Sequence, residues 1–85
     1  MIEFIHTVKD PNGMHARPAG LLVKEASRFE SEIMLYRGDK AASAKKLIAL
    51  LSLSVKSGET VRFTVVGPDE EVAAASLREY LMTHL

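Results

Sequence analysis

A histidine and an arginine two positions apart stand where a segment with helical periodicity begins. The stretch reads Gly13-Met14-His15-Ala16-Arg17-Pro18-Ala19-Gly20. The first turn of a helix offers unpaired backbone N–H groups and the positive end of the helix dipole, which together attract phosphate. Arg17 adds a permanent charge with a planar fork of donors that suits phosphate oxygens. Because a neutral imidazole nitrogen is a nucleophile, the pattern is consistent with reversible attachment of a phosphoryl group to His15.

Spacing alone leaves an alternative open, since a lone histidine at a helix start is more often a capping or surface residue. The other two histidines receive no role, because His6 falls on the inward side of a strand and His84 is terminal. We find no phosphate-binding glycine loop, no Ser–His–Asp set, and no histidine or carboxylate at ligand spacing from His15. We therefore expect neither nucleotide hydrolysis nor a metal or other cofactor.

Hydrophobic periodicity predicts the elements that must position this stretch. Alternation predicts strands at residues 2–9, 32–37, 40–43 and 61–65, and helical spacing predicts helices at 16–29, 47–53 and 69–85. This order predicts an α+β fold in which an antiparallel sheet has helices packed on one face. The first helix is expected to join two parallel strands that are not neighbours. We expect residues 1–85 to form a single domain.

The composition excludes several classes of protein. The chain has 85 residues, a formal net charge of zero and no cysteine, which argues against bulk nucleic-acid binding, disulfide frameworks and thiolate metal sites. No signal peptide or membrane span is recognised, so a cytoplasmic protein without membrane insertion is expected. The charge is unevenly spread, because residues 15–56 carry eight basic and four acidic side chains. This basic middle segment favours an acidic partner.

A second feature is the apolar run Leu47-Ile48-Ala49-Leu50-Leu51. A short helix cannot bury all of these side chains on one face, so some are expected to remain exposed as a docking patch for another protein. Arg17, Lys24 and Lys45 are candidates for a basic rim around it. The alternative is a core helix that is wholly buried.

In the stretch from Gly13 to Ala19 the sequence resembles HPr, the family of histidine-containing phosphocarrier proteins of the bacterial phosphotransferase system. The resemblance covers the whole chain and the order of its elements. Its further motifs are Ala26-Ser27, the hairpin around Gly38, the segment Leu47–Leu53, Lys56 with Gly58, and Gly67-Pro68-Asp69-Glu70.

The resemblance implies an open-faced β-sandwich of order βαββαβα, in which three helices cover one face of a four-stranded antiparallel sheet. It implies that His15 accepts a phosphoryl group on its pros nitrogen from Enzyme I and donates it to Enzyme IIA domains. Such a protein is a stoichiometric carrier, not an enzyme, and is expected to be a monomer. Residues with further implied roles are Ala16, Arg17 and Pro18 around the phosphate, and Gly20, Lys24, Leu47, Ile48 and Leu51 in partner docking.

The chain also departs from the family pattern. Members from low-GC Gram-positive bacteria carry a serine that is phosphorylated by an ATP-dependent kinase where this chain has Lys46, so that regulation is expected to be absent unless Ser43 or Ser52 substitutes. Ser54 stands where glycine is common, which predicts a local cost if the backbone there needs a positive φ. The apolar run is similar to that of the nitrogen-related branch, NPr, which leaves a regulatory role as the alternative to sugar uptake.

Overall fold

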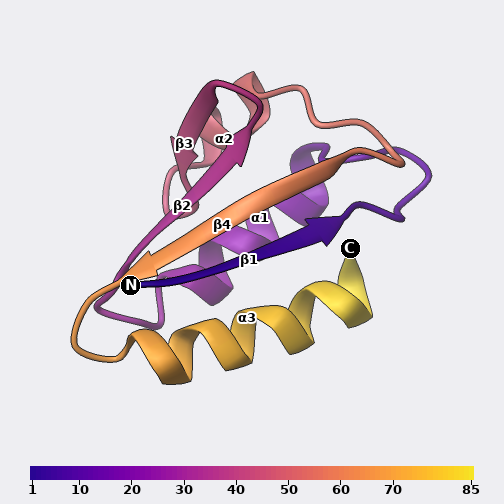
Figure 1. The fold of residues 1–85 in the computed structure, drawn as a ribbon. Helices are drawn as coiled ribbons and strands as arrows, with labels where there is room; N and C mark the ends of the chain where they lie inside the picture. The colour runs from indigo at the N-terminus through magenta and orange to yellow at the C-terminus, as the bar shows by residue number, and fades with distance from the viewer.

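The computed structural model describes residues 1–85 and contains four strands and three helices (Figure 1). They are β1 (Ile2–Thr7), α1 (Ala16–Ala26), β2 (Glu32–Arg37), β3 (Lys40–Ser43), α2 (Leu47–Ser52), β4 (Thr60–Val66) and α3 (Glu70–His84). The order βαββαβα and the α+β class predicted from the sequence are confirmed. None of the helices has the length and apolar content needed to cross a membrane.

The strands form one antiparallel sheet in the order β1-β4-β2-β3. The long strand β4 lies in the middle and pairs with β1 and with β2, so Phe63 lies opposite Phe4 on one side and Leu35 on the other. Because both neighbours run antiparallel to β4, β1 and β2 are parallel to each other without being adjacent. The connection through α1 is therefore the split βαβ unit that the sequence predicted.

The helices cover one face of the sheet, and the core lies between the two layers. The strands bury alternate side chains, among them Phe4, Leu35 and Phe63, while α1 contributes Leu22 and α3 contributes Leu77. Figure 1 shows α3 running along β1, with the C-terminus near the end of that strand. The backbone N–H of Lys9 donates to the carbonyl of Leu85 at 2.6 Å, which ties the chain end to the segment after β1.

Helix α1 ends at Ala26 and not at Phe29, so the predicted end was three residues too late. After Ala26 the N–H groups of Arg28 and Phe29 donate to carbonyls three residues back, at 3.2 Å each. The chain thus tightens into a turn of the 3₁₀ type, which keeps the apolar Phe29 packed against the core. Hydrophobic spacing continues through such a turn, and for that reason it could not mark the helix end.

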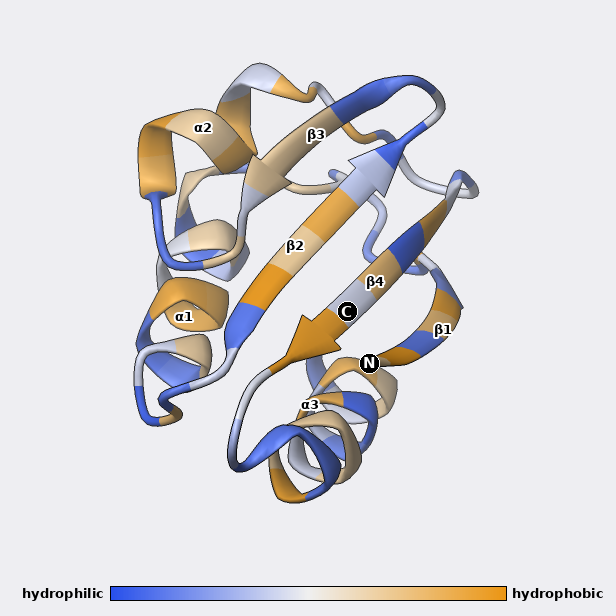
Figure 2. Cartoon of the chain, turned by 60° about the vertical axis from the view of Figure 1, so that its left-hand side comes forward, coloured by the Kyte–Doolittle hydropathy of each residue, from blue (hydrophilic) through white to orange (hydrophobic).

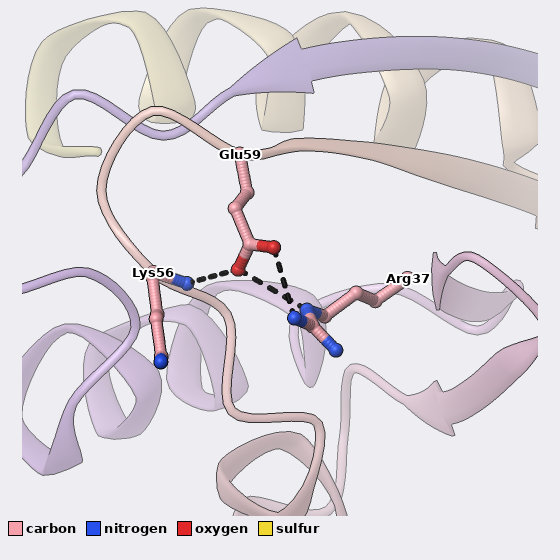
Figure 3. A network of polar contacts seen from close by, with 3 residues as sticks. All are labelled: Arg37, Lys56 and Glu59. Atoms are coloured by element: carbon pink, nitrogen blue, oxygen red, sulfur yellow. Dashed lines mark hydrogen bonds and ion pairs between the residues drawn. The ribbon is translucent and has the colours of Figure 1, made fainter.

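The carboxylate of Glu59 holds the loop before β4 in place through a small hydrogen-bond network (Figure 3). Its two oxygens accept from the guanidinium of Arg37 at 3.1 and 2.9 Å, and one of them also accepts from the backbone N–H of Lys56 at 2.6 Å. The hydrogen bond from Arg37, assisted by that from Lys56, lowers the pKa of Glu59 below its ordinary value. This network joins the end of β2 to the loop 55–59.

A second carboxylate connects the start of α3 to the start of β2. Asp69 accepts from the hydroxyl and the N–H of Ser31 and from the N–H of Glu30, and these bonds lower its pKa. Gly67 is required in the same corner, because its φ is +155° and a Cβ there would lie 2.6 Å from Ser31. These contacts fix the direction in which α3 leaves the sheet.

Ser54 is the one residue other than glycine with a positive φ, at +54°. The sequence expectation of a local cost at this position is therefore met by the backbone geometry, since a side chain in the left-handed region crowds the following carbonyl.

We predict that Ser54→Gly stabilises the protein by roughly 0.5–1 kcal/mol, because relief of the left-handed conformation exceeds the entropy that glycine adds to the unfolded chain. Urea unfolding at pH 7 measures the change. Ser57→Gly in the same loop is the matched control and should be neutral or destabilising, because its φ is not positive. If Ser54→Gly is less stable than the wild type, the positive φ of Ser54 does not destabilise the protein.

A second prediction concerns Glu59→Gln, which removes the charge that Arg37 binds. The folded-state pKa of Glu59 lies below its ordinary value of 4.5, so its contribution to stability is fully present above pH 4.5 and is lost as the pH falls through the lower value. We expect the variant to melt at a lower temperature than the wild type at pH 7, with the gap closing in acid.

Thermal unfolding followed by circular dichroism between pH 3 and 7 checks this. Glu32→Gln is the control, since Glu32 is exposed on β2 and takes part in no ion pair. A gap between Glu59→Gln and wild type that stayed constant with pH would count against the ion pair as its cause.

Candidate functional site

The turn that leads into α1 is locked against the loop after α2. Gly13 adopts a φ of +68°, and a Cβ on it would lie 2.5 Å from the carbonyl oxygen of Val55. The next residue, Met14, is buried and donates its N–H to the same carbonyl at 2.9 Å. Only glycine permits this approach, and the approach fixes where the following residue, His15, enters the helix.

His15 occupies the N-cap position of α1 with an extended backbone, at φ −98° and ψ −176°. Its carbonyl accepts the first helical hydrogen bond, from Ala19 at 3.0 Å. Its side chain makes no capping bond and is 42% exposed. The imidazole is therefore left free for chemistry, whereas the residue types preferred at an N-cap use their side chains on the helix itself.

The helix start behind the imidazole is open toward an anion. The N–H groups of Ala16 and Arg17 donate to no atom of the protein, and Pro18 has no N–H. No acidic residue lies in the first turn of α1. Two donors at the positive pole of an eleven-residue helix thus have no partner in the protein, and no acid within the first turn offsets them.

A hollow of about 390 Å³ adjoins this helix start, and His15 and Arg17 both line it. Arg17 is exposed and forms no ion pair, so its guanidinium is available to a ligand. His84, from the end of α3, lines the same hollow, with its ring packed on Tyr80 at 4.5 Å between centroids. Sequence spacing missed this neighbour because the two histidines are brought together only by the packing of α3.

Asp10 is a further residue that the sequence analysis did not bring to the site. Its carboxylate lies 3.8 Å from Nε2 of His15 and accepts the backbone N–H of Asn12 at 2.9 Å. No carboxylate stands at ligand spacing from His15 in the sequence, yet the turn brings that of Asp10 close to it. The signal was present in Asp10-Pro11-Asn12-Gly13, because an aspartate two residues before a hydrogen-bonded N–H closes an Asx turn.

His6 lies apart from the site. It lines a separate hollow of about 300 Å³ with Ile5 and Met82. Burial lowers the pKa of His6, and its Nε2 is buried without a partner. The prediction that His6 is a partly buried strand residue is confirmed.

The helix α2 exposes part of its apolar surface, as expected. Leu50 is fully buried, whereas Ile48 is 76% and Leu47 37% exposed, and Leu51 is half-buried. This excludes the wholly buried alternative. Figure 2 shows α2 as a predominantly hydrophobic segment next to α1, on which Leu21 is also exposed.

Gly20 and Lys24 lie on α1, which packs against α2. Lys24 is exposed, and Gly20 would meet nothing within 4 Å if it carried a Cβ. Neither backbone strain nor close internal packing explains a glycine inside the helix, where it costs about 1 kcal/mol relative to alanine. We name the surface formed by Gly20, Lys24, Leu47, Ile48 and Leu51 the docking patch.

The basic rim expected around the docking patch is partly wrong. Lys45 is not free, because its ammonium group donates to the carbonyl of Phe29 at 2.6 Å and is partly buried. It is used to close the turn after α1. Among the cations near the patch, Arg17 and Lys24 form no ion pair, and neither does Lys46, which directly precedes α2.

Lys46 is the N-cap of α2, with an exposed side chain that makes no capping bond. The two serines considered as substitutes are already bonded. The hydroxyl of Ser43 accepts from the N–H of Lys45 at 3.1 Å, and that of Ser52 donates to the carbonyl of Ala49 at 2.6 Å. Neither serine stands at the start of α2, so the loss of a regulatory serine stays a prediction.

Comparison with known proteins places these features in a family. The family model PTS-HPr, described as the PTS HPr component phosphorylation site, matches residues 2–83. The phosphocarrier protein HPr of Buchnera aphidicola is 42% identical over 76 residues, 89% of each chain. The HPr-like protein Crh of Halalkalibacterium halodurans is 40% identical over 81 residues, 95% of this chain and 96% of its own.

The fold agrees with a solved structure as well. The crystal structure of an HPr from Thermoanaerobacter tengcongensis, titled HPr-C-His, superposes with a TM-score of 0.94 at 36% identity. The superposition covers 99% of this chain and 94% of the other. The open-faced α+β arrangement expected from the resemblance is thereby confirmed.

Proposed function

The chain belongs to the PTS-HPr family, and from this premise we propose that it carries phosphoryl groups in the phosphotransferase system, taking them from Enzyme I on His15 and giving them to Enzyme IIA domains. It is a stoichiometric carrier that acts as a cytoplasmic monomer. The observation that carries the proposal is the free imidazole of His15, placed at an open helix start beside the unpaired Arg17.

The surroundings of the three histidines favour His15 as the acceptor. A phosphoryl group adds about two negative charges, which two free N–H groups, a helix N-terminus and Arg17 all stabilise at His15. His84 stands at the opposite, negative pole of α3. His6 lies within β1 and not at a helix start, and its Nε2 is buried.

The docking patch is proposed as the surface that both partners bind. Ile48 and Leu47 provide exposed apolar area for an interface core, and Lys24 and Arg17 provide positive charge that speeds encounter with an acidic surface. The patch adjoins the phosphoryl site through α1, so one docking event brings a partner's active residue to His15.

A regulatory role is the second candidate function. It is favoured by the apolar run Leu47–Leu51, which is similar to that of the nitrogen-related branch, and by the 40% identity to an HPr-like protein named Crh. Phosphoryl transfer from the labelled chain to a panel of Enzyme IIA domains separates the two. Fast transfer to sugar-specific domains supports the carrier of sugar uptake, and transfer confined to nitrogen-branch domains supports regulation.

We predict that Enzyme I and phosphoenolpyruvate place an acid-labile phosphate on the wild-type chain and none on His15→Ala. Arg17→Ala should accept the phosphate about 10- to 100-fold more slowly, because it loses charge-assisted hydrogen bonds to the phosphoryl oxygens. Quench-flow labelling measures both. The melting temperature of Arg17→Ala should change little, since its side chain is exposed and unpaired.

The matched control for charge is Arg28→Ala, just beyond the same helix, whose exposed guanidinium pairs only with Glu25. Its labelling rate should equal that of the wild type. A phosphate that persists in His15→Ala would disprove the acceptor, and equal rates in the two arginine variants would remove Arg17 from the site.

The docking patch generates a further prediction. Ile48→Glu should weaken binding to Enzyme I by about tenfold or more, because a charge would be desolvated where an apolar contact is lost. Val72→Glu is the control, since Val72 is 65% exposed on α3, away from the patch. Calorimetric titration measures both affinities, and equal affinity for the two variants would contradict the patch.

A further inference from the structure

The carboxylate of Asp10 is held close to His15 by the turn between them. Its Oδ1 lies 3.8 Å from Nε2 of His15. The same oxygen accepts the N–H of Asn12 at 2.9 Å, and the backbone carbonyl of Asp10 accepts the N–H of Gly13 at 2.9 Å. Because Gly13 is in turn locked against Val55, the carboxylate and the imidazole are fixed relative to each other by the fold.

Asp10 is also the only carboxylate-bearing side chain that lines the hollow of His15. The other groups there that carry or can take a positive charge, Arg17 and His84, form no ion pair with anything. A carboxylate lining a site that binds a phosphoryl anion is unfavourable in itself, since like charges repel. Its position is explained if it acts on the imidazole and not on the phosphate.

A neutral imidazole carries one proton, and the hydrogen-bond partner of one nitrogen decides which nitrogen bears it. A carboxylate only accepts, so it favours the tautomer with the proton on Nε2. We propose that Asp10 is a positioning residue that keeps the proton of His15 on Nε2 and so leaves the lone pair on Nδ1 for the phosphoryl group. This inference rests on the proposed phosphocarrier function.

With this tautomer, no proton has to leave or enter the ring during phosphoryl transfer. The lone pair of Nδ1 forms the N–P bond, and the bond from phosphorus to the donor breaks with its electron pair leaving on the donor. Nε2 keeps its proton, so the ring becomes a cation beside the carboxylate. When the acceptor attacks phosphorus, the N–P electron pair returns to Nδ1 and the ring is neutral again.

The distance of 3.8 Å is longer than a hydrogen bond and within the range of an ion pair. The positive ring of the phosphorylated state is attracted to the carboxylate more strongly than the neutral ring, so the contact is expected to shorten on phosphorylation. Catalytic contacts commonly tighten only in the reacting complex. Asp10 therefore stabilises the ring while it carries the phosphoryl group.

The test is Asp10→Asn, which keeps an oxygen for the N–H of Asn12 but removes the charge. Long-range ¹H–¹⁵N spectra of the unphosphorylated protein at pH 8 read the tautomer of His15 directly. We expect the ratio of the Nε2–H to the Nδ1–H form to fall by about threefold or more in the variant, because the neutral amide attracts the Nε2 proton less than the carboxylate does. Phosphoryl transfer from Enzyme I should slow with it, at an unchanged melting temperature.

Asp39→Asn in the exposed β2–β3 turn is the matched control and should leave both the tautomer and the rate as in the wild type. If the wild type accepts phosphate and Asp10→Asn has the same tautomer ratio and the same transfer rate, the role of Asp10 is disproved, while the carrier function is supported. A wild type that accepts no phosphate overturns the proposed function, and the tautomer spectra then still report whether Asp10 directs the proton. Should Asp10→Asn unfold, the Nε2–H form must predominate in the wild-type spectrum, and an excess of the Nδ1–H form disproves the inference.

Discussion

The close contact between Gly13 and the carbonyl of Val55 is the constraint on which the site depends. It leaves no room for a side chain at residue 13, two residues before His15, where the chain enters α1 in an extended conformation. The loop that supplies this carbonyl is itself held to the sheet, because Glu59 joins Lys56 to Arg37. The position of the imidazole therefore depends on β2, through the loop that contains Glu59 and the turn that contains Gly13. The start of α1, with its free N–H groups, follows directly from that turn.

Helix α1 meets two demands on its opposite faces. Its inner face carries Ala19, Leu22 and Ala26, all fully buried, and these small or branched residues let the helix lie close to the sheet. Its outer face carries the exposed Lys24 and Gly20, where an added Cβ would meet nothing within 4 Å. A glycine that weakens the helix without relieving any contact is understandable if a partner must approach the backbone there, which is the role proposed for the docking patch.

The sequence predicted the features that depend on neighbours along the chain. Alternation identified the strands, and the hairpin at Gly38 and the partial exposure of α2 were reached from local rules. It did not predict the strand order with β4 in the middle, since pairing partners are set by packing. Lys45 was misplaced for the same kind of reason, because its partner is the carbonyl of Phe29, which only the turn after α1 directs toward it.

The residues of the candidate site also differ in whether they are close in the chain or are brought together by folding. His15 and Arg17 are close in the chain and were found from spacing and family resemblance, whereas Asp10 and His84 reach the hollow through a turn and through the packing of α3. The end of α1 shows a limit within local reasoning itself. Hydrophobic spacing persists through the 3₁₀ turn to Phe29, so periodicity cannot distinguish Ala26, the last α-helical residue, from the residues of that turn.

A carrier of the proposed kind must release the group that it binds, and the structure is open enough for that. His15 is 42% exposed, and the phosphoryl group would be held by two N–H groups and one exposed arginine. The docking patch offers few exposed apolar side chains, chiefly Ile48 and Leu47, which suits the small interfaces of transient complexes. Donor and acceptor need the same face, so each complex has to dissociate before the next can form, and tight docking would slow the relay. The rate of transfer then depends on whether His15 already has the reactive tautomer when a partner binds. Asp10, fixed beside Nε2, favours that tautomer before either partner arrives.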